Sequence, residues 1–469
     1  MAKPTLYIPG LPGSDLLRGG RKVFLRVPES FEQPALGLLR GPDDLTAVDP
    51  VTAGLPVAEI RGSGIFSILA FFTDLKRAES LYDILRDYYP AGEFIDRCRR
   101  FGWDWRRPVW DLRTRDAFST ALIEHRQRHG KVVIIAHSTG GLVLRHLLED
   151  ATNPRRDEVL DAIDRIIAFG VPWAGLLKTF KTISGQEGLA PLLGPAEAQE
   201  VLARSWASFD LMPPPPAASA PSLPALVTRN GQHTSPLADR AWHPPAGALR
   251  DAMVLRSDET LTNWGSRSPV IDDGGRQIPI TNVVGWGFDT TTSAELSAGG
   301  GVDFRESDDG DNTVPRASAA WLSSPNVETF HVPIGRGDGR RAYKHIVLWG
   351  NDGGRSLLAH HVNGEALEAF VYATVDFSDV GDGGPEVRVR YVALAADGSP
   401  LASPSVSFRT PSARPRELFA GNLAGRHTSV IPRSSLRTVS ASLRRLELDV
   451  EWQEGGQPRN KTFGFFVAR

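Results

Sequence analysis

The stretch KVVIIAHSTGG, residues 131–141, decides the fold of this chain. Its five consecutive apolar residues, which end at Ala136, predict a short strand that is buried on both faces. The segment GGLVLRHLLED, which starts at Gly140, predicts a helix. Ser138 therefore stands where a buried strand turns into a helix, a strained turn that needs small residues two positions before and after the serine. Ala136 and Gly140 meet this need, so Ser138 is the candidate nucleophile.

The segments on either side alternate between strand-like and helix-like patterns. This alternation is typical of the α/β class, in which a mostly parallel sheet carries helices on both faces. Strands are expected at residues 5–9, 131–136, 163–172, 281–288 and 327–335, and helices within 76–100, 114–129 and 140–150.

The chain is expected to form two domains. Residues 1–365 are predicted to be the α/β domain, with cap or lid insertions at about 50–80 and 180–280. The second insertion holds the stretch LMPPPPAASAPSLPA, which is too rich in proline for regular structure. In residues 366–469, apolar and polar residues alternate as in half-buried antiparallel strands, which predicts an all-β, sandwich-like module.

Composition argues against several classes of function. The formal net charge of −2 offers no general attraction for polyanions, so no nucleic-acid partner is expected. The single cysteine, Cys98, excludes an internal disulfide, and no run of apolar residues is long enough to predict a transmembrane helix. An apolar strand-like run that starts by residue 5 leaves no room for a signal peptide, so we expect a cytoplasmic protein.

A serine hydroxyl is a weak nucleophile, so Ser138 would need a histidine base and a carboxylate that orients the base. In α/β-hydrolase folds these groups follow the chain order serine, aspartate or glutamate, histidine. The alternative role for Ser138 is a helix N-cap. The strand before it and the helix after it favour the nucleophile.

Five of the eleven histidines lie beyond residue 320, where this order places the base. His345 follows a loop rich in glycine and arginine, from which a side chain can reach the edge of the sheet. His331 falls within a strand-like alternation, and His427 falls in the C-terminal β-module. His360 and His361 lie on a predicted helix as surface or packing residues. The preferred base is therefore His345.

The acidic loop ESDDGDNTVPRAS, residues 306–318, supplies the candidate carboxylate. Asp311 stands directly before the NTVP segment and is the preferred residue. Asp308 and Asp309 are expected to be solvated turn residues. A cation site there would need further oxygen ligands that the sequence does not place, so we expect no metal and no cofactor.

Attack on an acyl carbon creates an oxyanion that needs preorganised N–H donors. One donor is expected to be the backbone N–H of Thr139, directly after the nucleophile. The other is expected in the turn YIPGLPGS, residues 7–14, where Leu11 is the preferred residue. An ordinary tight turn is the alternative for that stretch.

Eight blocks of sequence, in the same order, resemble those of the lecithin:cholesterol acyltransferase family of α/β-hydrolases. That family includes phospholipid:diacylglycerol acyltransferases and a lysosomal phospholipase. The similarity spans roughly residues 5–360, and its strength lies in the order of the blocks. The blocks are IPGLPGS (8–14), FGWDWRRPV (101–109), AHSTGGLV (136–143), FGVPWAGLLKTFKTISGQ (169–186), SWASFDLMPP (205–214), GWGFDT (285–290), GDNTVP (310–315) and YKHIVL (343–348).

The resemblance implies the same candidate catalytic residues as the sequence motifs, and it adds two tryptophans to the site. Trp103 and Trp105 fall where the family shapes its substrate region, although buried core aromatics are the alternative. Two positions depart from the family pattern, since Ala136 replaces the usual first glycine and Thr139 often has a larger counterpart. The implied roles are nucleophile for Ser138, orienting acid for Asp311, base for His345, and oxyanion donors for Leu11 and Thr139.

The most apolar stretch of the chain is GSGIFSILAFFTDL, residues 62–75. In the family, the corresponding region lies near a lid or a membrane-touching segment. An exposed apolar segment of this kind can bind a lipid surface without spanning it, and Phe71 and Phe72 would then contact the acyl chains. The alternative is a buried helix or a loop that closes the pocket.

These observations predict a serine acyl hydrolase or acyltransferase that cleaves phospholipid-like esters, with peripheral membrane contact. The acyl group would pass through Ser138 to water or to an alcohol. Two alternatives remain: a carboxylesterase that acts on a soluble ester or lactone, and a non-catalytic interaction protein. The C-terminal module lies outside the resemblance, so its protein partner is unknown.

Overall fold

The computed structural model describes most of the chain. The described residues are 2–11, 14–18, 21–22, 52–56, 81–188, 195–203, 205–216, 223–237, 254–255, 277–286, 288–307, 309–322, 326–333, 345–350, 352–365, 370–375, 386–394, 405–409, 415–420, 427–432, 437–438, 443–454 and 456–468. Phe71 and Phe72 lie outside these residues. Among the described residues, no helix combines the length and the apolar character needed to cross a bilayer.

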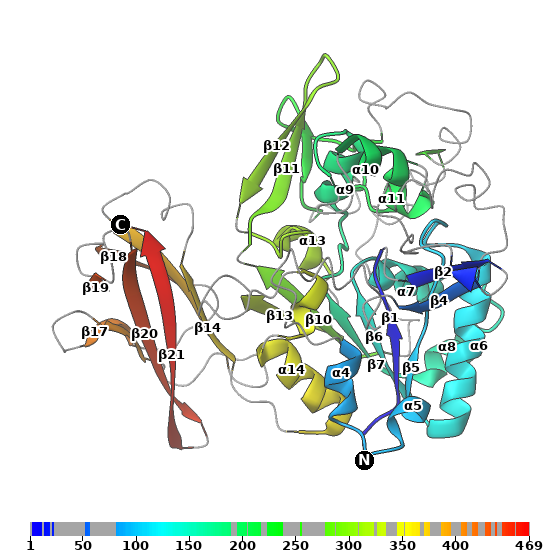
Figure 1. Cartoon of the computed structure of the whole chain (residues 1–469), viewed down its shortest axis with the longest axis horizontal. Helices are drawn as coiled ribbons and strands as arrows, with labels where there is room; N and C mark the ends of the chain where they lie inside the picture. Colours follow the sequence, from blue (N-terminus) through cyan, green and yellow to red (C-terminus); the bar gives the residue numbers. More distant parts are fainter. Residues whose placement is uncertain are drawn as a thin grey trace.

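The centre of the fold is a parallel sheet (Figure 1). Within the described residues it has six strands in the order β13-β10-β7-β6-β1-β5, and each neighbouring pair runs parallel. The strands are β1 (Thr5–Ile8), β5 (Cys98–Arg100), β6 (Val132–His137), β7 (Ile163–Phe169), β10 (Ile280–Trp286) and β13 (Val327–Pro333). The five strands predicted from the sequence are all present, and β5 adds an edge strand next to β1.

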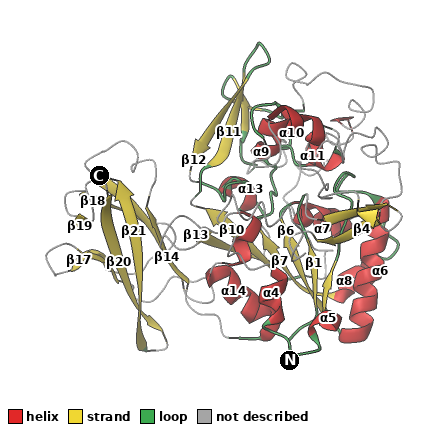
Figure 2. Cartoon of the chain, in the orientation of Figure 1, coloured by secondary structure: helices red, strands yellow, loops and turns green. Residues whose placement is uncertain are grey.

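Helices cover both faces of this sheet (Figure 2). Successive residues of a strand point to opposite faces, so Ile134 packs into one hydrophobic cluster and Ile135 into the other. The first cluster includes residues of α6 (Leu112–His129), α7 (Thr139–Glu149) and α8 (Arg156–Ala162). The second includes residues of α4 (Leu81–Arg86), α5 (Phe94–Arg97), the 3-10 helix η4 (His345–Gly350), α14 (Asp352–Leu358) and the π-helix η5 (Ala359–Asn363). This two-faced burial confirms the predicted α/β class.

A second sheet, ordered β12-β11-β8-β9, lies above the main sheet in the view of Figure 1. It pairs strands from within the predicted 180–280 insertion with a hairpin that follows β10, so this layer continues past residue 280. The polar sequence TTTSAEL of β11 gives no hydrophobic signal for a strand. The strands of this sheet are β8 (Val227–Arg229), β9 (Gln232–His233), β11 (Thr290–Leu296) and β12 (Val302–Ser307). The described helices that lie between β7 and β13 along the chain are α9 (Leu177–Ile183), α10 (Pro195–Leu202), α11 (Trp206–Asp210) and α13 (Arg316–Ala319).

Antiparallel strands make up the remaining described elements. A small sheet joins β2 (Ser14–Arg18), β3 (Arg21–Lys22) and β4 (Thr52–Pro56). The C-terminal strands form two antiparallel sheets, as the alternating pattern predicts (Figure 1). One contains β14 (Phe370–Val375), β15 (Glu386–Leu394) and β18 (His427–Pro432); the other contains β16 (Ser405–Arg409), β17 (Pro415–Ala420), β19 (Arg437–Thr438), β20 (Leu443–Glu454) and β21 (Gln457–Ala468).

Candidate active site

Ser138 forms a sharp turn between β6 and α7. Its backbone has φ 52° and ψ −130°, a conformation that a residue with a side chain adopts only under strain. The backbone N–H of Ser138 donates to the carbonyl of Phe169, 3.0 Å away, which ties the turn to the next strand. The serine occupies the N-cap position of α7, but its hydroxyl makes no capping hydrogen bond. The geometry therefore does not support the alternative role of Ser138 as a helix-capping residue.

The two glycines after the turn let α7 approach the sheet closely. A Cβ placed on Gly140 would lie 2.6 Å from the carbonyl oxygens of Ile8 and Pro9. A Cβ on Gly141 would lie 2.3 Å from the side chain of Val171. Both distances are far below a normal contact, so only glycine fits at either position. The elbow thus brings Ser138 against the end of β1.

The turn after β1, predicted to supply an oxyanion donor, lies directly beside the serine. A Cβ placed on Gly10 would be 2.6 Å from the Cβ of Ser138. The next residue, Leu11, is half-buried against the first hydrophobic cluster. Thr139 is the first residue of α7, where the N–H groups have no acceptor within the helix.

Trp103 and Trp105 form hydrogen bonds with this turn. Their side chains are only 1% and 2% exposed. The indole N–H of Trp103 donates to the carbonyl of Pro9 at 2.9 Å, and that of Trp105 donates to the carbonyl of Ser14 at 3.2 Å. The backbone N–H of Trp103 also donates to the hydroxyl of Ser14 at 3.1 Å. Both tryptophans are therefore buried aromatics that fix the backbone of the turn next to Ser138.

Asp311 and His345 form a buried acid–histidine pair. Nδ1 of His345 lies 2.7 Å from Oδ2 of Asp311, and the two residues are 4% and 1% exposed. The other carboxylate oxygen, Oδ1, accepts the backbone N–H groups of Val314 at 2.7 Å and Thr313 at 3.1 Å. A proton on Nδ1 points to the carboxylate, which leaves Nε2 of His345 able to accept another.

Gly170, just after β7, lies against this pair. Its φ is +55°, and a Cβ at this position would lie 2.9 Å from Oδ2 of Asp311 and 3.0 Å from Nδ1 of His345. Its N–H donates to the carbonyl of Val283 at 2.9 Å. The absence of a side chain here leaves room for the acid and the histidine to meet.

His137 links the pair to the serine. Its Nε2 lies 2.9 Å from the backbone carbonyl of His345, and the two rings are 4.7 Å apart. Because His137 precedes Ser138 directly, this contact brings His345 to the elbow. The sequence contains no local signal for this role, because the partner lies 208 residues away.

The other candidate groups lie elsewhere. His361 bonds Thr281, and His360 bonds the carbonyl of Glu365. His331 and His427 lie in β13 and β18, as predicted. Asp309 pairs with Arg316, with Nε 2.7 Å from Oδ1 of the carboxylate, whereas Asp308 lies outside the described residues.

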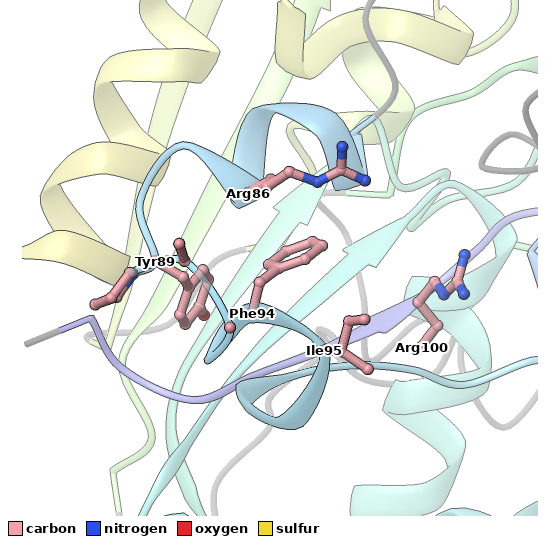
Figure 3. A pocket seen from close by; sticks show the side chains of 8 residues that line it. Arg86, Tyr89, Phe94, Ile95 and Arg100 are labelled. Atoms are coloured by element: carbon pink, nitrogen blue, oxygen red, sulfur yellow. The ribbon is translucent and has the colours of Figure 1, made fainter.

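A pocket of about 430 Å³ lies between α4, α5 and β5 (Figure 3). Arg86 and Arg100 stand at its sides, with Phe94 and the largely exposed Ile95 between them. None of the residues around Ser138 lines this pocket. It is therefore separate from the candidate active site.

Part of the chain is similar in sequence to known proteins. A family model for lecithin:cholesterol acyltransferase matches residues 50–234, which include Ser138. "Lysosomal phospholipase A and acyltransferase" of Rattus norvegicus is 27% identical over 125 residues, which cover 25% of this chain and 29% of the relative. "Lecithin-cholesterol acyltransferase-like 1" of Arabidopsis thaliana is 26% identical over 216 residues, which cover 44% and 46%. The chain thus aligns with less than half the length of either relative.

Among solved structures, a chain in "The crystal structure of Tle4-Tli4 complex" covers 76% of this chain and 97% of its own length. The TM-score is 0.47 and the identity 14%. The strand order of this chain by itself defines its fold. The parallel sheet with helices on both faces and the strained strand-to-helix turn define an α/β-hydrolase fold. Residues 50–234 are similar in sequence to the lecithin:cholesterol acyltransferase family.

Proposed function

We propose that the protein is a serine acyl hydrolase or acyltransferase that cleaves phospholipid-like esters. The observation that carries this proposal is the buried hydrogen bond between Asp311 and His345 beside the strained Ser138 turn. A serine nucleophile, a histidine base and a carboxylate that orients the base are the groups that acyl transfer needs. They also occur in the chain order of an α/β-hydrolase.

In this mechanism, the hydroxyl of Ser138 attacks the ester carbonyl while Nε2 of His345 takes its proton. Asp311 accepts the Nδ1–H, which keeps the correct tautomer and stabilises the imidazolium that forms. The backbone N–H groups of Leu11 and Thr139 bind the oxyanion. His345 then protonates the departing alcohol, which leaves the acyl group on Ser138.

The second half of the reaction regenerates the serine. Water or an alcohol loses a proton to His345 and attacks the acyl-enzyme, which releases a free acid or a new ester. Trp103 supports both halves through its bond to Pro9, because that bond fixes the turn that carries Leu11.

A lipid ester is favoured over a soluble ester by the relatives. The names of both relatives include the word acyltransferase, and one also includes phospholipase A. The apolar segment 62–75 supplies a second argument, since it is suited to contact a lipid surface. We assign Phe71 and Phe72 to acyl-chain contact on this sequence argument alone.

The test is product analysis by mass spectrometry. Purified protein is incubated with mixed phospholipid vesicles, with and without a long-chain alcohol, beside a Ser138→Ala variant. Lysolipid and free fatty acid that disappear in the variant would identify a phospholipase, and an acylated alcohol formed at the expense of free acid would identify a transferase. If no lipid product depends on Ser138, the assignment of a lipid ester as substrate is overturned.

The membrane contact has its own test. A Phe71→Ser/Phe72→Ser double variant should bind vesicles of the same composition less tightly in a sedimentation assay, because its apolar contact area is reduced. It should keep its activity on a short soluble ester. Unchanged vesicle binding would show that this segment does not contact the membrane.

A further inference from the structure

His137 lies between the serine turn and the helix that carries His345. It is the last residue of β6 and is 7% exposed. Its Nε2 lies 2.9 Å from the backbone carbonyl oxygen of His345. Because a carbonyl can only accept, Nε2 of His137 must carry the proton and donate it.

The ring of His137 also packs along the 3-10 helix η4. It lies 4.7 Å from the ring of His345 at an interplanar angle of 37°. It lies 4.9 Å from the ring of Trp349, four residues further along η4, at an angle of 84°. One side chain therefore contacts η4 at two points, through a hydrogen bond at its first residue and an edge-to-face contact near its end.

The ring is neutral in the folded protein. Burial lowers the pKa of His137 well below the usual 6.5, and the neighbouring His345 lowers it further. A neutral ring places no positive charge beside the imidazolium that His345 becomes during catalysis. A hydrogen bond from a neutral donor thus positions His345 without opposing its protonation.

We propose that His137 is a positioning residue that fixes the base His345 relative to the nucleophile Ser138. This inference rests on the proposed function of Ser138 and His345. His137 and Ser138 are consecutive in the chain, so a single hydrogen bond couples the backbone of the nucleophile to that of the base. His137 acts through His345 and does not contact the substrate.

Two variants separate the hydrogen bond from the packing. His137→Phe keeps a ring of similar size against Trp349 but has no N–H donor. His137→Gln has an amide N–H close to the position of Nε2. The matched control is His125→Phe, because His125 is another buried histidine whose Nε2 meets a backbone carbonyl, that of Arg97 at 3.2 Å.

The first readout is the rate at which a fluorophosphonate labels Ser138, which needs an oriented base but no lipid substrate. We expect His137→Phe to slow labelling about 10- to 100-fold, because small displacements of reacting groups have effects of this size. His137→Gln should recover most of the labelling rate. Both phenylalanine variants should lower the melting temperature, but His125→Phe should still be labelled as fast as the wild type. With an ester substrate, His137→Phe should lower kcat and leave KM unchanged.

A spectroscopic readout is independent of turnover. The Nδ1–H of His345, bonded to Asp311, should give a low-field proton resonance in the wild type and in His137→Gln. This resonance should broaden or disappear in His137→Phe.

The outcomes of these tests are distinguishable. Equal labelling of the wild type and His137→Phe, with the resonance intact in both, would overturn the positioning role. Labelling that slows as expected in a protein that cleaves no phospholipid would uphold the role and overturn only the lipid substrate. A wild-type Ser138 that does not react at all would overturn both.

Discussion

Asp311 holds His345 at two points. Oδ2 of the carboxylate lies 2.7 Å from Nδ1 of the ring, and the backbone carbonyl of Asp311 accepts the backbone N–H of His345 at 2.9 Å. The carboxylate is itself fixed, since Oδ1 accepts two N–H groups from the turn that follows. The position of His345 is therefore set by the loop that begins at Asp311.

Asp311→Asn should nearly abolish activity while leaving the fold intact. The amide oxygen would take the place of Oδ1, because that position faces the N–H groups of Thr313 and Val314. The amide NH2 would then face Nδ1 of His345 and force the proton onto Nε2, the wrong tautomer for a base. We expect kcat on a chromogenic ester to fall about 10³- to 10⁴-fold.

Asp309→Asn is the matched control. Asp309 lies in the same loop but pairs with Arg316 at a partly exposed position, a contact of the kind that contributes about 0–1 kcal/mol. Its kcat should stay close to that of the wild type. Equal losses in the two variants would mean that the loop as a whole, and not the carboxylate beside His345, determines the activity.

The sequence predicted those parts of the site whose signals are local or follow chain order. An apolar run that ends in Ser138 and two glycines indicates an elbow, and the order of triad groups in the α/β-hydrolase fold leads to Asp311 and His345. The structure brings the acid and the histidine together across 34 residues of chain. The catalytic roles of all three stay a prediction, as do the boundary at residue 365 and the cytoplasmic location.

Features that depend on contacts between residues far apart in the chain could not be predicted from the sequence. The bond from His137 to His345 and the tight contact of Gly170 with the pair appear only once the chain is folded. The sequence also did not predict that the buried indole of Trp103 donates to the carbonyl of Pro9, and the role of Trp103 in the substrate region stays a prediction. Composition and periodicity contain no information about such contacts.

Ser138→Gly should be more stable than Ser138→Ala, although both should be inactive. The backbone at Ser138, with φ 52° and ψ −130°, stores strain of about 1–3 kcal/mol, which glycine relieves. The greater freedom of glycine in the unfolded chain offsets about 0.5–1 kcal/mol of that gain. A net difference of about 1 kcal/mol should appear in the free energy of unfolding by denaturant titration. If the alanine variant is the more stable, the turn is not strained.

Acidification should destabilise the protein through its buried histidines. Burial lowers the pKa of His125 to about 4 and that of His361 to about 3, from the usual 6.5. Below pH 6.5 the unfolded chain therefore binds protons that the folded chain does not, so stability falls as the pH falls. Each such histidine should contribute a slope of about 1.4 kcal/mol per pH unit between 6.5 and its folded pKa.

His125→Phe isolates one part of this effect. The variant loses the hydrogen bond to Arg97 at every pH, but it also loses one titrating group. Its free energy of unfolding should therefore decline less steeply between pH 6 and 4.5 than that of the wild type. Parallel curves for the two proteins would show that His125 is not held neutral by burial.

Trp103→Phe should lower kcat with little change in overall packing. The phenyl ring fills most of the space of the indole but cannot donate to the carbonyl of Pro9, which is bonded at 2.9 Å. Losing this bond frees the turn that packs Gly10 against Ser138. Since a hydrogen bond of this kind contributes about 1 kcal/mol, we expect a loss in kcat of about 10-fold at most.

The control for this prediction is Trp321→Phe. Trp321 is also buried, but its indole N–H has no partner among the described residues, so the substitution removes bulk without removing a bond. Fluorophosphonate labelling of Ser138 and ester turnover should both slow in Trp103→Phe and stay near the wild-type values in Trp321→Phe. Equal slowing in the two would mean that aromatic packing, and not the bond to Pro9, keeps the turn in place.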